Sequence, residues 1–133
     1  MIDKIRAALE TKLNSINPPI ETVWENFNYD PELETPYQEP TLLFTRPDNL
    51  GFGDGPYLQR GYMQVSLRYP LGNGSGDATE RARLLRDTFF RGLSLAKDGV
   101  TTVIEETPEV PAGAIEGDRF VINVRIRFYA SIN

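Results

Sequence analysis

The chain of 133 residues contains neither cysteine nor histidine. Without these side chains there are no disulfides, and zinc sites of the common kind and Ser-His-Asp or Cys-His catalysis are excluded. Enzymatic hypotheses are therefore limited to carboxylate, lysine or tyrosine chemistry, and we expect no enzyme, no cofactor and no metal. At this length one core can stabilise the fold without cross-links, so we expect a single domain over residues 1–133.

Long hydrophobic runs are also missing. The longest in the middle of the chain is Leu42-Leu43-Phe44, far short of the roughly 20 apolar residues that span a bilayer. The first residues lack the basic-then-apolar order of a secretion signal, so we expect no membrane contact and assembly in a cytoplasm. A formal charge of −5 makes nucleic acid a poor non-specific partner.

Two segments show helical periodicity. The first runs from residue 2 to the breaker Pro18-Pro19, and its apolar stripe comprises Ile5, Leu9, Leu13 and Ile16. The second is predicted over residues 78–92, with Asp77 and Glu80 in the positions of a capping box. Its apolar stripe comprises Ala78, Ala82, Leu85, Phe89 and Leu93.

Five β-rich runs surround the second helix, and the last of them alternates most clearly between apolar and polar residues. We predict strands at residues 21–24, 41–45, 62–69, 100–106 and 119–129. Because strands and helices do not alternate regularly, the pattern favours an α+β fold. We expect a mostly antiparallel β-sheet with two α-helices packed on one face, joined by long loops at residues 46–57, 70–77 and 105–119.

Acidic residues are concentrated in two segments. Residues 13–45 and residues 98–118 each hold six acids and no base. They predict either an anionic surface, such as a channel wall that repels DNA, or ordinary solvated loops. The adjacent pair Glu105-Glu106 is a poor catalytic pair, because neighbouring strand residues point to opposite faces.

Arginine outnumbers lysine by 11 to 3. One group lies on the last strand, at Arg119, Arg125 and Arg127, and another follows the second helix, at Arg81, Arg83, Arg86 and Arg91. These guanidinium groups either pair with acids of a neighbouring copy, which would close a head-to-tail ring, or pair within one subunit. The sequence leaves both readings open.

The Gly- and Pro-rich loop at residues 46–57 contains Asp48, Phe52 and Asp54. Its acids do not match the spacing of an EF-hand, so a mobile docking loop is the better interpretation. Our candidate residues for a subunit or tail interface are Arg83, Arg91, Arg119, Arg125, Arg127, Asp48, Phe52, Asp54, Glu105 and Glu106.

Three groups of residues carry a resemblance to a known family. They are Trp24-Glu25-Asn26-Phe27 with Tyr29 and Pro36-Tyr37; residues 65–72 (Val-Ser-Leu-Arg-Tyr-Pro-Leu-Gly); and Ala78, Arg81-Ala82, Leu85 and Phe89. In these positions the chain resembles the tail terminator, or tail completion, proteins of siphophages of the lambda type. The likeness covers most of the chain, and its motifs are packing and turn patterns.

The resemblance implies a structural subunit of the virion tail. Copies would form a hexameric ring on the tail tube protein, stop tube polymerisation and present a surface to the head-tail connector protein, and genome DNA would pass without specific binding. The family has no catalytic residues to transfer. Three alternatives remain: a neighbouring head-to-tail joining protein, a small-ligand binding domain or carboxylate enzyme, and a nucleic-acid-associated subunit that uses the arginine strand.

Overall fold

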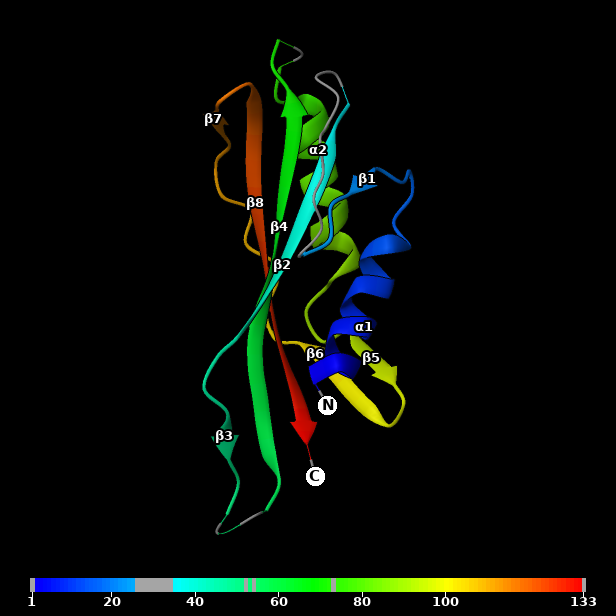
Figure 1. Ribbon diagram of the computed structural model, residues 1–133, viewed down its shortest axis with the longest axis vertical. Coiled ribbons are helices and arrows are strands. Elements are labelled where there is room, and N and C mark those ends of the chain that lie inside the picture. Colours follow the sequence, from blue (N-terminus) through cyan, green and yellow to red (C-terminus); the bar gives the residue numbers. More distant parts are fainter. Residues whose placement is uncertain (1, 26–34, 52, 54, 73, 133) are drawn as a thin grey trace.

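The computed structural model describes residues 2–25, 35–51, 53, 55–72 and 74–132, and it shows an elongated sheet with both helices on one side (Figure 1). None of its described helices is long and apolar enough to cross a membrane. In chain order the elements are α1 (Ile2–Asn14), β1 (Glu21–Thr22), β2 (Tyr37–Phe44), β3 (Asp48–Asn49), β4 (Tyr57–Pro70), α2 (Gly76–Thr88), β5 (Ser94–Lys97), β6 (Val100–Ile104), β7 (Ala114–Glu116) and β8 (Arg119–Ile132).

The sheet is built around two long central strands. β4 and β8 have 14 residues each and pair antiparallel over their full length, from Tyr57 opposite Ile132 to Pro70 opposite Arg119. The strand order is β1-β2-β4-β8-β6-β5, with β3 added beside β4 and β7 added beside β8. Only β1 and β2 run parallel among the described pairs, so the predicted antiparallel α+β architecture is confirmed.

The core fills the space between the sheet and the helices. Strand alternation sends Met63, Val65 and Leu67 of β4 to this side, where they are fully buried beside Val124 and Ile126 of β8. Each helix adds its apolar face to the same cluster. The residues are Ile5, Leu9 and Leu13 of α1 and Ala78, Ala82 and Leu85 of α2. Burial of each large apolar side chain contributes about 1.5–3 kcal/mol, so this interface fixes the helices on one face of the sheet.

The second helix differs from its prediction at both ends. It spans Gly76–Thr88 rather than residues 78–92, its N-cap is Ser75 without a side-chain cap hydrogen bond, and Asp77 lies in the first turn. The proposed capping box is therefore wrong. The predicted helix is too long because its apolar stripe includes Phe89. This residue is fully buried, but it is the C-cap and lies outside the helix.

Three segments predicted as loops or left unassigned contain strands. Residues 48–49 of the predicted mobile loop form β3, residues 94–97 form β5, and residues 114–116 form β7. The β5–β6 hairpin turns at Asp98 and Gly99, which both have positive φ, at 49° and 84°. An Asp-Gly pair of this kind is a strong hairpin signal, which the β-branched run after it obscured.

The β3–β4 hairpin extends beyond the helical layer at one end of the molecule (Figure 1). We define the arm as β3 with the first four residues of β4, Tyr57–Arg60. Besides the pairing of β3 with β4, two backbone hydrogen bonds flank the arm: Leu50 N donates to Pro56 O at 3.0 Å, and Thr45 N donates to Arg60 O at 2.9 Å. The arm therefore continues the sheet beyond the helical layer, while its residue Tyr57 still packs against the core.

Candidate interaction surface

The side of the sheet opposite the helices is rich in arginine and tyrosine. Strand alternation places polar side chains of β2, β4 and β8 on this side, which we call the open face. Its central members are Glu39, Arg60, Tyr62, Gln64, Ser66, Arg68, Asn123, Arg125, Arg127 and Tyr129. All of these side chains are partly exposed. A partner could therefore contact them, while neighbouring side chains on the sheet restrict their conformations.

Tyr62 is the centre of the open face. The guanidinium of Arg125 lies 4.4 Å from the centroid of its ring, and that of Arg127 lies 5.7 Å away. Arg125 also donates a hydrogen bond to Gln64 Oε1 at 3.0 Å. The register explains this cluster, because Tyr62 stands opposite Arg127 and Gln64 stands opposite Arg125.

Carboxylates of the same subunit neutralise several of these arginines. Arg127 lies 3.5 Å from Glu109, and Arg68 lies 3.4 Å from Glu39. Arg60 bridges Asp48 of β3, at 2.6 Å, and Glu105, so it ties the arm to the segment after β6. Of the arginines for which the sequence left two readings open, Arg127 thus makes an ion pair within its own subunit.

Arg119 lies at the other end of β8 and is buried, with 4% of its surface exposed. Its guanidinium stacks 5.0 Å from the ring centroid of Tyr37 and donates to the carbonyl of Thr35 at 2.6 Å. Burial, followed by the nearby charge of Glu39, raises the pKa of the Tyr37 phenol. Arg119 thus fixes the start of β2 against β8.

The remaining candidate residues do not join this cluster. Arg83 is exposed on α2 and pairs with Glu80 and Asp87 on the same helix; its hydrogen bond lowers the pKa of the Glu80 carboxyl. Arg91 follows the end of α2 and is exposed, as is Glu106 after β6. Phe52 and Asp54, and the motif residues Asn26, Phe27 and Tyr29, lie outside the described residues.

A comparison with protein-family models matches residues 4–128 to the phage tail terminator protein family. The chain belongs to this family. A search of curated proteins found no match. Five chains among the solved structures match, and one, whose name says nothing of its function, is 20% identical with a TM-score of 0.80. That alignment covers 98% of this chain and 95% of the other, and at this identity it shows a shared fold alone.

Membership of the tail terminator family makes this chain a structural component of a phage tail. The suspected resemblance is thereby confirmed. On the open face the arginines stack on tyrosine or pair with carboxylates of the same subunit. Among the described residues there is no group of three or more acids that could hold a metal ion.

Sequence reasoning missed several residues of this tail protein's surface. Tyr62, Arg60 and Glu109 were not candidates, although the alternation over residues 62–69 already placed Tyr62 on the polar side of its strand. These residues meet on the open face because of the β4–β8 register and of an isolated antiparallel β-bridge between the backbones of Glu109 and Arg125. Both join positions that are distant in sequence. The sequence contains no local signal of these pairings.

Proposed function

We propose that this chain caps the tail tube: copies form a ring on its last layer, stop polymerisation and present the surface that joins the head. Its membership of the tail terminator family supports this function. The structural observation that carries the proposal is that large apolar side chains are exposed at opposite ends of the long axis. A subunit between a tube and a connector needs two such docking ends.

The first end is formed by the turn after β4 together with β7. Ile115 is 69% exposed and Leu71 is 44% exposed, and both border a groove of about 220 Å³ with Phe120. The second end is the arm, beside which Leu50 is 45% exposed. Figure 1 shows β7 and β3 at opposite ends of the molecule. At the first end Leu71 and Ile115 form an exposed apolar patch, and such patches mark interaction sites in soluble proteins.

The charge pattern supports a ring through which DNA passes without specific binding. Arg60, Arg68 and Arg127 are each paired with a carboxylate of the same subunit, so the open face offers few unpaired cations to phosphates. Arg91 and Glu106 are exposed and make no ion pair within the described part of the chain. In our proposal these two residues supply contacts between neighbouring copies, while Arg83 and the arginines of β8 order each subunit.

Tail preparations assembled in a host bacterium without this protein test the proposal. Electron microscopy should show overlong tubes, and adding the purified protein during assembly should restore the normal length. Tubes of normal length that lack heads would instead identify a head-to-tail joining protein. Tubes of normal length that carry heads would remove both functions.

Separate variants test the two ends. We expect one of Leu50→Asp and Ile115→Asp to lose control of tube length and the other to lose head joining. Ile2→Asp is a matched control, because Ile2 is 50% exposed but lies at the start of α1. If both end variants assemble normal virions, the apolar ends are not docking sites.

A further inference from the structure

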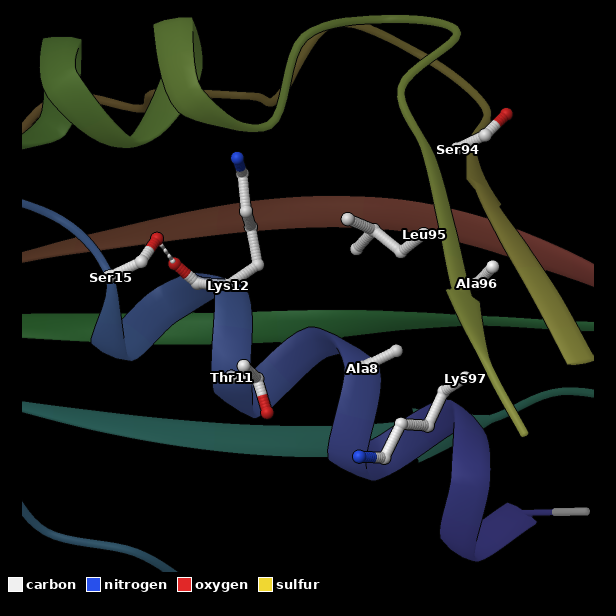
Figure 2. Close-up of a pocket in the computed structure, with 8 residues that line it drawn as sticks. All are labelled: Ala8, Thr11, Lys12, Ser15, Ser94, Leu95, Ala96 and Lys97. Carbon is white, nitrogen blue, oxygen red and sulfur yellow. Dashed lines mark hydrogen bonds between the residues drawn. The ribbon is translucent and has the colours of Figure 1, made fainter.

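A cleft of about 480 Å³ lies between α1 and β5, away from the open face (Figure 2). Its α1 wall is formed by Ala8, Thr11, Lys12 and Ser15. The opposite wall is formed by the four consecutive residues of β5, Ser94–Lys97. Because successive strand side chains point to opposite faces, a cleft lined by all four must follow the edge of the strand.

β5 is the last strand of the sheet on this side, and it pairs only with β6 among the described strands. Ile104 N donates to Leu93 O at 2.9 Å, and bonded pairs alternate along an antiparallel ladder. The N–H and C=O groups of Ser94 and Ala96 therefore point away from β6. They leave an open edge on which another extended segment can add.

The cleft is positively charged although the protein carries a net charge of −5. Two of its three lysines, Lys12 and Lys97, line it, and no aspartate or glutamate is among its lining residues. Neither lysine makes an ion pair within the described ranges. Figure 2 shows them on different walls, with Leu95 between them in this view. The third lysine, Lys4, donates to the carbonyl of Asp98 at 3.3 Å beside the hairpin turn.

We propose that this cleft binds an extended acidic segment of a partner protein, which pairs with the free edge of β5 between Lys12 and Lys97. The edge supplies backbone hydrogen bonds, the lysines supply charge-assisted contacts to alternate acidic side chains, and Leu95 supplies an apolar floor. One subunit contains the whole cleft, so binding can be measured on the isolated chain.

Fluorescence anisotropy with a labelled six-residue peptide of alternating Glu and Thr tests the proposal on the full chain. The double variant Lys12→Glu/Lys97→Glu should weaken binding about tenfold or more. The control Arg46→Glu/Arg86→Glu, which changes the net charge equally at two exposed sites, should not. Two results would contradict an acidic segment as the ligand. One is a Gln-Thr peptide that binds as tightly as the Glu-Thr peptide, and the other is complete displacement of the Glu-Thr peptide by equimolar inorganic phosphate.

Ala96→Pro tests strand pairing separately from charge. Proline removes the outward N–H of Ala96 and is tolerated on an edge strand, so the β5–β6 pairs should remain. Peptide binding should fall as strongly as in the lysine variant, with an unchanged circular dichroism spectrum. Ser94→Ala, which keeps the backbone N–H, is the control and should bind normally. Binding that survives Ala96→Pro, or no binding by the unmodified protein, would overturn the proposal.

Discussion

The guanidinium of Arg125 lies 4.4 Å from the centroid of the Tyr62 ring, on the face of the sheet opposite the helices. Arg127 approaches the same ring at 5.7 Å, so one tyrosine faces two cations of the neighbouring strand. Repulsion between these cations is offset by Glu109, 3.5 Å from Arg127. The tyrosine thus helps to order these arginines, together with the Arg125–Gln64 hydrogen bond and the Arg127–Glu109 ion pair.

Tyr62→Leu should destabilise the protein because leucine keeps apolar bulk but has no π face for the arginines. At this partly exposed site we expect a loss of about 1 kcal/mol in the free energy of unfolding. Urea denaturation followed by fluorescence measures it. Tyr62→Phe keeps the ring and should be nearly neutral, so equal losses in both variants would show that the stacking contributes nothing.

The secondary structure that depends on periodic apolar residues was predictable from the sequence. Both helices and the alternation of β8 were predicted, because Ile5 and Leu9, or Val124 and Ile126, recur at the spacing of their element. Element ends were less predictable. Phe89 continues the stripe of α2 in sequence but lies outside the helix, since burial depends on the tertiary fold and not on helical conformation.

The candidate surface was harder to predict, because it depends on cross-strand register. Arg81 shows the difficulty: the sequence placed it in the arginine row along the second helix, yet only 4% of its surface is exposed. It donates a hydrogen bond to the carbonyl of Pro18, and burial lowers its pKa. Its partner is a backbone group 63 positions away, which composition and spacing do not indicate.

Gly61→Ala should be destabilising, because β4 has no room for a side chain at this position. A β-carbon there would overlap the carbonyl oxygen of Leu43 and touch the ring of Phe128. Forcing extra volume into a packed site costs about 1–3 kcal/mol, which thermal or urea unfolding resolves. Gly76→Ala, at the start of α2 with open space around it, is the control. Equal stability of the two variants would contradict this packing.

Tyr69 should make the protein lose stability in alkali. Burial raises the pKa of its phenol above the ordinary 10.0, so the folded state holds the proton more tightly than the unfolded state. This contribution is complete below pH 10 and is lost as the pH rises through the folded pKa. Tyr69→Phe removes the titrating group, and its unfolding free energy should fall less steeply above pH 10. Identical slopes would contradict the shift.

Arg60→Met should loosen the arm without unfolding the core. Arg60 links Asp48 of the arm to Glu105, but the pairs are partly exposed, so together they contribute only about 1 kcal/mol. That amount corresponds to about fivefold faster local opening, which hydrogen exchange at the Leu50 amide should report, while exchange at Val65 stays unchanged. Arg46→Met, at an exposed arginine without an ion pair among the described residues, should leave the Leu50 amide unchanged. If both variants leave that amide equally protected, strand pairing with β4 and β8 holds the arm without a contribution from the ion pairs of Arg60.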